Sequence, residues 1–232
     1  MSHTAKRLRY ILPGVATVIL LYLISTAFTQ MSAAMHYYKA NNRLVQWAAQ
    51  GNIASNSDYE NTKSTAKQAV KLSNNNPLYL DVLADVYQWG LYQNFESNSA
   101  KVVEEAMQLY QLSIQNRPVW PVTWANMAML KWRINEFDSE FKLYLNQADK
   151  LGRSQPEVHL LFTELGLAAY KARHPLYTEY QQRIKHRLYQ ALLTPQSRDR
   201  ALALIDKYEL QRTTCRWLLQ KHHGFVLQVA NC

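Results

Sequence analysis

The stretch that most constrains this 232-residue chain runs from residue 106 to residue 131. Its first part carries Ala106, Tyr110 and Ser113 three or four residues apart, and Pro118 then interrupts the pattern. Its second part resumes at offsets of 0, 3, 4 and 7, with Trp124, Met127, Ala128 and Lys131. Small residues let helix backbones approach closely, whereas proline cannot continue a helix. The stretch therefore predicts a helix, a break and a second helix, all closely packed.

The same offsets occur twice more along the chain. One set precedes the stretch and consists of Leu80, Leu83, Ala84 and Tyr87. The other follows it and consists of Phe162, Leu165, Gly166 and Ala169. The first residues of consecutive sets are 44 and then 38 residues apart. Recurrence at such intervals is the sequence signature of a helical-repeat architecture.

These residues resemble the tetratricopeptide repeat, whose pattern is Trp-x2-Leu-Gly-x2-Tyr, then Ala-x3-Phe, then Pro. Ala106 and Tyr110 take the places of the second-helix Ala and Phe, and Pro118 takes that of the proline. The pair Leu165-Gly166 restores the Leu-Gly of the pattern. The resemblance covers roughly residues 60–170 and implies an all-α, α-solenoid domain that binds proteins and is not an enzyme. The alternative is an ordinary series of helical hairpins.

The N-terminal segment predicts a single transmembrane helix. No charged residue occurs between Tyr10 and Met35, and the apolar part up to Phe28 is 19 residues long. That length approaches the ~30 Å hydrocarbon core of a bilayer. Lys6, Arg7 and Arg9 precede the segment, so the positive-inside rule places the N-terminus in the cytoplasm. The alternative is a signal peptide cleaved near residues 32–34, and both interpretations place the bulk of the chain outside the cytoplasm.

The remaining pattern predicts an all-helical chain with few breaks. Residues 35–49 continue the first helix, and the cluster Ser55–Asp58 is a predicted cap for a helix over 59–72. Later helices are expected over residues 138–151, from 156, over 175–193, from 195 to about 208, and over 212–221. Residues 225–229 are expected to be a short extended tail. The predicted domains are a cytoplasmic tail (1–9), a transmembrane helix (10–29), a linker helix (30–58) and an extracytoplasmic repeat domain (59–232).

An aromatic insertion separates the first two sets of offsets. It adds about ten residues to a repeat of about 34 and contains Trp89, Tyr92 and Phe95. Aromatic residues at a hairpin tip are candidates for an interaction loop. The alternative is that they lengthen the first helix and pack against it.

Positive charge is concentrated in the C-terminal part of the chain. The net charge is +9, and residues 171–232 hold 11 Lys or Arg but four Asp or Glu. The candidate basic surface consists of Arg183, Lys185, Arg187, Arg198 and Arg200. Such a surface would suit a lipid headgroup, an acidic glycan or an acidic protein, and the alternative is a solvated helix face. Nucleic acid is not an expected partner, because no motif for its binding is found.

The chain offers little catalytic or metal-binding chemistry. Cys215 and Cys232 predict a disulfide closing a loop of about 17 residues, since cysteines outside the cytoplasm usually pair, and the alternative is two free thiols. The seven histidines lack the spacing of a metal site; for example, His222 and His223 are adjacent. We therefore predict no catalytic residue, no cofactor and no metal.

The layout as a whole resembles the VpsP-type accessory proteins of bacterial exopolysaccharide biosynthesis. The shared features are a short basic start, one N-terminal span, a repeat-like extracytoplasmic domain and a C-terminal Cys. The resemblance implies a single-pass protein of the bacterial inner membrane with a periplasmic main domain, which contacts proteins of the polysaccharide assembly or export machinery. A periplasmic chaperone-like subunit beside secretion machinery is the alternative function, and an enzyme acting on a surface glycan is a third.

Overall fold

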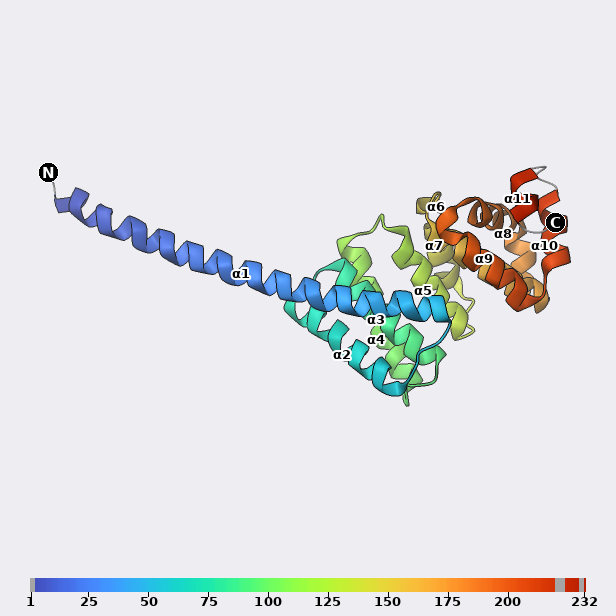
Figure 1. The fold of residues 1–232 in the computed structure, drawn as a ribbon, viewed down its shortest axis with the longest axis horizontal. Helices are drawn as coiled ribbons and strands as arrows, with labels where there is room; N and C mark the ends of the chain where they lie inside the picture. Colours follow the sequence, from blue (N-terminus) through green and yellow to red (C-terminus); the bar gives the residue numbers. More distant parts are fainter. Residues whose placement is uncertain (1–2, 220–223, 230–231) are drawn as a thin grey trace. The chain divides into compact units, whose positions relative to one another are not determined.

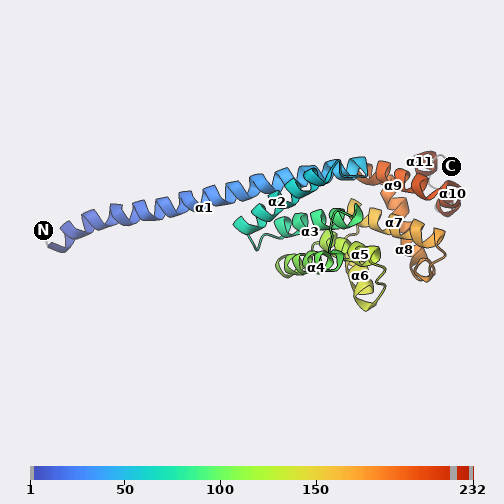
Figure 2. The same ribbon diagram turned by 90° about the horizontal axis from the view of Figure 1, so that it is seen from below.

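The structure, a computed structural model, describes residues 3–219, 224–229 and 232, and within them the side chains of 13–219, 224, 228, 229 and 232. These residues form α-helices joined by short connections, and the described part of the chain contains no strand (Figures 1 and 2). The fold is therefore all-α, as the sequence predicts. The chain divides into two compact units, residues 1–118 and 119–232.

Unit 1 consists of one very long helix and three shorter ones. They are α1 (His3–Gln50), α2 (Asn56–Leu72), α3 (Pro77–Tyr92) and α4 (Ser99–Asn116). Both views show that α2 and α3 lie beside the C-terminal part of α1, while its N-terminal part extends beyond them, and Figure 2 shows α4 on the far side of α3 (Figures 1 and 2). By length and composition α1 could cross a membrane, with a mean hydropathy of 1.6 over its most apolar window. The N-terminal apolar segment is thus one continuous helix with the segment that packs on unit 1.

Aromatic side chains hold α1, α2 and α3 together. The indole of Trp47 is buried on α1 and donates a 2.8 Å hydrogen bond to Asp58 at the start of α2. Tyr59 is also fully buried, and its ring lies directly on the backbone of α3 at Gly90. A Cβ at Gly90 would lie 2.3 Å from the Tyr59 ring, so only glycine fits this crossing.

Unit 2 contains the remaining helices. They are α5 (Pro121–Arg133), α6 (Ser139–Leu151), α7 (Pro156–Lys171), α8 (Pro175–Leu193), α9 (Pro195–Tyr208), α10 (Gln211–Leu219) and α11 (Gly224–Val229). An apolar core of this unit joins α7, α8, α9 and α10 through Leu167, Leu188, Ile205 and Trp217. Gly166 lets α7 approach α8, because a Cβ there would lie 2.1 Å from Ile184. This is the glycine of the Leu-Gly pair, and it serves the close packing that the repeat pattern requires.

Four helices, α3, α5, α7 and α9, share the same start and the same end. Each has proline in its first turn, which suits proline because that N–H needs no helical partner. Each ends in a Schellman motif, in which a left-handed residue follows the helix and the next N–H bonds back five residues. The left-handed residues are Asn94, Asn135, Arg173 and Glu209, with φ between 54° and 58°. The hairpin repeat therefore continues to α9, one unit further than the sequence pattern indicates.

Most of the expected helix boundaries agree with the structure. Ser55 caps α2 by accepting from the N–H of Asp58, and Gly152 follows α6 as its C-cap. The extended tail predicted for residues 225–229 is wrong, because they belong to helix α11. A run of five residues cannot separate strand from helix by period, and the described residues offer no strand for it to pair with. Lys221, the predicted end of the preceding helix, lies outside the described residues.

Candidate interaction surface

A shallow apolar groove on unit 1 is the candidate interaction surface. It measures about 200 Å³ and is lined by Leu83 and Tyr87 of α3 and by Glu105, Gln108, Leu109 and Leu112 of α4. We call this set of residues the α3–α4 groove. The α3 side chains are buried and form its floor, whereas the side chain of Leu112 is 44% exposed and forms its rim. An apolar floor with a partly polar rim suits an apolar side chain of a protein partner.

The repeat geometry determines why the groove exists. Ala106, Tyr110 and Ser113 turn the inner face of α4 onto α3 and are fully buried there. Leu109 and Leu112 lie on a neighbouring face of the same helix, so they remain at the edge of the contact. α4 therefore has more apolar residues than its contact with α3 can bury.

Tyr87 is a buried phenol on the floor of the groove. Burial is the main cause that raises the pKa of Tyr87 far above its ordinary value, and the charge and hydrogen bond of Glu105 raise it further. Lys67 of α2 also lies 5.7 Å from the centre of the Tyr87 ring. The phenol consequently stays neutral at physiological pH. Glu105 and Gln108 add acceptors and a donor at the rim, which would orient a bound segment.

A second depression, between α1 and α2, is polar. It measures about 430 Å³ and is lined by Lys39, Ala40, Arg43, Asp58, Asn61, Thr62, Ser64 and Thr65. Asp58 is already engaged, because it accepts from Trp47 and lies 3.5 Å from Arg43. Within the described residues, no group of three or more His, Cys, Asp or Glu side chains is arranged to hold a metal ion.

The aromatic insertion packs mostly inside unit 1. Trp89 lies 6.2 Å from Trp47 between ring centres, and Phe95 stacks on Tyr59 at 5.7 Å. Tyr92 contacts the edge of Trp89 and is about half exposed. Helix α3 extends through residue 92, so Trp89 and Tyr92 lengthen the first helix of the α3–α4 hairpin. This is the arrangement that the sequence analysis gave as the alternative to an interaction loop. Only Tyr92 of the three presents a large exposed area for a partner.

The predicted basic residues do not form a single exposed set. Arg183 and Arg200 are exposed, while Lys185 and Arg198 are partly buried, and Arg198 donates to the carbonyls of Leu192 and Leu193. Arg187 contradicts the prediction, because its side chain is 4% exposed. Sequence spacing alone cannot show that this arginine faces inward along α8.

Arg187 is instead the polar centre of unit 2. Its guanidinium bonds to the Asp149 carboxylate at 2.7 and 2.9 Å and to the Gly152 carbonyl at 2.7 Å. It also donates to His159 Nδ1 at 3.2 Å, so that nitrogen is the acceptor and the ring is neutral. Burial, followed by the charge of Arg187, lowers the pKa of His159 to about 4. Arg187 thereby ties α8 to the turn between α6 and α7.

A similar buried cation closes the connection between α5 and α6. Lys131 is 6% exposed and lies 2.5 Å from Asp138, 2.8 Å from Glu140 and 3.1 Å from Glu136. Burial opposes its charge, but the three carboxylates outweigh that effect and raise its pKa. The pKa of Asp138 falls in turn, mainly through its bond to Lys131. The repeat pattern includes Lys131, but it does not predict that Glu136, Asp138 and Glu140 surround this side chain.

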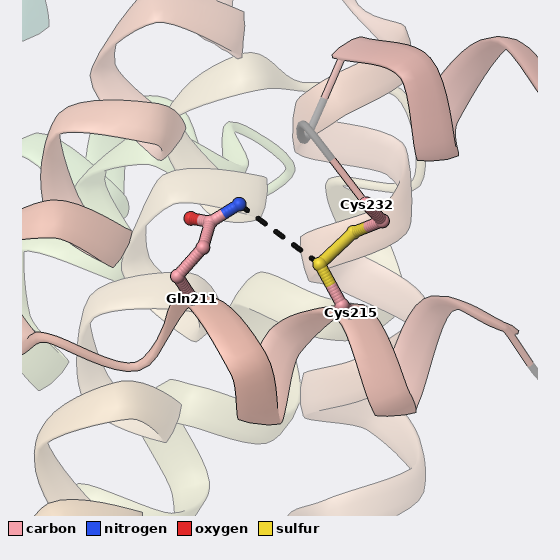
Figure 3. The surroundings of a disulfide bond; sticks show 3 residues. All are labelled: Gln211, Cys215 and Cys232. Carbon is pink, nitrogen blue, oxygen red and sulfur yellow. Dashed lines mark hydrogen bonds between the residues drawn. A yellow bond between two sulfur atoms is a disulfide. The ribbon is translucent and has the colours of Figure 1, made fainter.

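A disulfide joins Cys215 on α10 to Cys232 at the end of the chain (Figure 3). Gln211, one turn before Cys215 on α10, points its amide nitrogen at the Cys215 sulfur from 3.9 Å. The pairing matches the one that the sequence suggested. It attaches the chain end to α10.

The comparisons with known proteins are sparse. No protein-family model matches the chain, and no curated protein matches it. A structure described as a functional characterization of Pseudomonas aeruginosa pilF aligns with 83% of this chain and 91% of that chain, at 16% identity and a TM-score of 0.29. A TM-score this low supports no argument about fold or role. The repeat assignment therefore rests on the helix starts, ends and crossings described above.

Proposed function

We propose that this chain is a membrane-anchored scaffold of bacterial exopolysaccharide biosynthesis or export. Helix α1 would span the inner membrane at residues 10–29, with residues 1–9 in the cytoplasm and the helical units in the periplasm. The basic residues before the apolar segment support this orientation. The resemblance in layout to VpsP-type accessory proteins supports the polysaccharide role.

The α3–α4 groove is the observation that carries the scaffold proposal. Leu109 and Leu112 add apolar surface that α3 does not cover. Exposed apolar surface of this kind commonly marks a site for another protein. The hairpin packing fixes the groove in place, so a partner would meet a preformed surface and lose little entropy in ordering it.

The proposed partner is a protein of the polysaccharide assembly or export machinery. It would insert an apolar side chain between Leu109 and Leu112. Glu105 and Gln108 would fix its orientation by hydrogen bonds at the rim. An acidic glycan is a further proposed ligand, for which Arg200 and Arg183 are the exposed cations of the predicted basic set, although Arg183 also contacts Asp149 and Asn146.

Complementation of a deletion strain tests this function. Deleting the gene is expected to lower exopolysaccharide output, and the wild-type chain is expected to restore it. Leu112→Asp places a charge in the groove and should fail to restore it. Leu143→Asp is the matched control, because Leu143 is a similarly exposed leucine of unit 2, at 49% against 44%.

Three results of this experiment would contradict the proposal. Normal polysaccharide output in the deletion strain would refute the polysaccharide role, and a loss of protein secretion instead would favour the chaperone-like alternative. Equal restoration by Leu112→Asp and the wild type would refute the groove as the contact surface. The abundance of each variant in the membrane must be measured in parallel, so that misfolding is not taken for loss of contact.

A further inference from the structure

Helix α1 carries an exposed apolar stripe that the other helices of unit 1 do not cover. Beyond the apolar segment, four large side chains on it are 55–66% exposed, namely Met31, Met35, Tyr38 and Val45. Asn42, also exposed, fills the gap between the last two. The five residues are spaced 4, 3, 4 and 3 residues apart, which is the a and d spacing of a heptad. We call this set the α1 stripe.

The heptad register explains which side of α1 contacts unit 1. With Met35 and Asn42 at a positions, Ala33, Ala40 and Trp47 occupy f positions. These three residues are buried against the other helices of unit 1. Because f lies on the opposite side of a helix from the a–d seam, the α1 stripe faces directly away from unit 1. One face of α1 is thus buried against the other helices of unit 1. The opposite face is apolar, and those helices do not cover it.

The same spacing continues without interruption into the apolar segment. Leu21, Ile24 and Phe28 extend the stripe at intervals of 3, 4 and then 3 residues to Met31, and each is more than half exposed. The a and d positions from residue 21 to residue 49 cover four heptads and contain no charged residue. Their residues are Leu21, Ile24, Phe28, Met31, Met35, Tyr38, Asn42, Val45 and Ala49.

We propose that the α1 stripe is the seam of a parallel homodimer, in which a second copy of the chain supplies an identical α1. This inference rests on the proposed membrane anchoring. Two copies inserted in the same direction hold their α1 helices parallel and at the same height. The α1 stripe of one copy then faces the same residues of the other copy in register. Membrane anchoring does not impose such an alignment on a different protein.

The polar residues along the seam fit this arrangement. Asn42 occupies an a position, where a pair of asparagines can bond to each other and fix register and a two-stranded state. The flanking e and g positions bring Lys39 opposite Ala34 and Gln46 opposite Asn41, so no like charges meet. Arg43 is a b residue and already lies 3.5 Å from Asp58. Dimerisation therefore buries no uncompensated charge.

Lipid cannot cover the whole stripe. Tyr38 lies ten residues past Phe28, which is about 15 Å further along the helix, and Val45 lies about 25 Å further. Both are therefore outside the hydrocarbon core if Phe28 is near its boundary. Their exposed apolar surface needs a protein partner.

Cysteine crosslinking of the full-length chain in its native membrane tests this proposal. Cys215 and Cys232 are bonded to each other, so a new cysteine reports on its own neighbours. Tyr38→Cys and Val45→Cys place sulfur at d positions. Gln50→Cys is the matched control, because Gln50 is exposed on the same end of α1 but lies at a b position. Two differently tagged copies should be expressed together, so that a product of two chains is recognised.

Mild oxidation is expected to link the two tagged copies through either d position roughly five-fold more than through Gln50→Cys, because a disulfide needs Cβ atoms about 4 Å apart. The dimer would be refuted if neither d-position cysteine gave a crosslink between the two tagged copies. It would also be refuted if Gln50→Cys gave as much crosslink as the d positions, or if the d-position cysteines linked to another protein. Asn42→Leu provides a second readout. It should keep the d-position product and add species larger than a dimer, whereas an unchanged pattern would refute the role of Asn42.

The anchoring is measured separately by alkaline extraction of the same membranes. Tagged copies that are linked but extracted into the soluble fraction would refute the anchoring, and with it the stated reason for a parallel pair. Chains that stay in the membrane without linking would refute the dimer and leave the anchoring intact. The two failures are thus distinguishable.

Discussion

Units 1 and 2 contain the same kind of hairpin but hold it together with different chemistry. In unit 1, neutral phenols paired with carboxylates are prominent among the buried polar groups, beside the ion pairs of Arg117 with Asp81 and of Lys63 with Glu96. Tyr110 donates to Asp85 at 2.5 Å and accepts from Gln88 at 2.7 Å, and Tyr59 bonds to Glu96. Burial raises the pKa of both tyrosines, so they stay neutral at any physiological pH. Unit 2 depends instead on the buried cation Arg187 and on a neutral histidine.

The surfaces of the two units differ as well. Unit 1 exposes the α3–α4 groove and the α1 stripe, whereas unit 2 has few large apolar side chains that are well exposed among its described residues, namely Val119, Leu143 and Leu219. The last helices of unit 2 are short, and a disulfide ties the chain end to them. Terminal repeats commonly close an array in this way. Most of the exposed large apolar side chains among the described residues therefore lie on unit 1.

The largest expected effect breaks the polar centre of unit 2. Arg187→Ala leaves the Asp149 carboxylate and three backbone carbonyl groups without their donor, so the free energy of unfolding should fall by about 3–5 kcal/mol. Arg183→Ala is the matched control one turn earlier on α8, where an exposed pair should contribute less than about 1 kcal/mol. Hydrogen exchange of the full chain would show whether protection is lost only in unit 2. Equal losses for the two variants would contradict the role of Arg187.

A glycine in each unit offers a direct comparison of their packing. Gly90→Ala and Gly166→Ala both place a Cβ against a neighbouring side chain, and each should cost up to about 3 kcal/mol. The added Cβ at position 90 would have to displace the Tyr59 ring, which stacks on Phe95 and bonds to Glu96. The added Cβ at position 166 would have to displace the smaller side chain of Ile184. We therefore expect the larger loss at Gly90, measured by thermal unfolding. Gly14→Ala, with no atom near its Cβ, is the control and should not destabilise the chain.

Acid should weaken unit 2 before unit 1. His159 has an ordinary pKa of 6.5, which the fold lowers to about 4. Between these values the unfolded chain binds more protons than the folded one, so the free energy of unfolding falls as the pH drops. The loss should be roughly 2 kcal/mol at about pH 5. Asp138 does not contribute in this range, because its pKa lies below 3.8 and its stabilisation is lost only in stronger acid.

Denaturant unfolding at about pH 7.5 and about pH 5 would measure this effect. His159→Gln keeps an acceptor for Arg187 but does not titrate. It should therefore remove most of the difference between the two pH values. A difference that persists in the variant would show that another group causes it.

The smallest expected effect concerns the left-handed residues that end the repeated helices. Arg173 adopts a φ of 54° that costs an L-residue about 1 kcal/mol, so Arg173→Gly should stabilise unit 2 by about 0.5–1 kcal/mol. Asn135→Gly at the equivalent position should gain less, because asparagine tolerates this conformation better. A rise in melting temperature measures both. Destabilisation by Arg173→Gly would show that its side chain makes a needed contact.

Much of the fold could be predicted from sequence because it depends on local rules. Helical spacing, prolines at helix starts and the close approach of Gly166 follow from short stretches of chain. The sequence does not predict the repeat in α9, because the feature that ends this helix is a left-handed Glu209, and glutamate has no preference for that conformation. The extended tail predicted for residues 225–229 is wrong, because the segment is too short for its period to distinguish a strand from a helix.

The candidate surface was harder to predict, since it depends on which face of each helix is covered. Trp89 and Phe95 are candidates for an interaction loop in the sequence. In the structure Trp47 packs on Trp89, and Tyr59 packs on Phe95, from positions distant along the chain. Arg187 looked like part of a basic surface, but Asp149 and His159 surround it. Leu109 and Leu112 were overlooked because their exposure follows from the rotation of α4, which only the structure provides.

Photocrosslinking in living cells tests most directly whether the partner protein contacts the α3–α4 groove of unit 1 and not unit 2. A photoreactive amino acid would replace Leu112 in the α3–α4 groove or Leu143 on α6, two leucines of similar exposure. We expect position 112 to capture a protein of the polysaccharide assembly or export machinery and position 143 to capture none. Capture of the same protein from position 143 alone, or from neither position, would contradict this expectation.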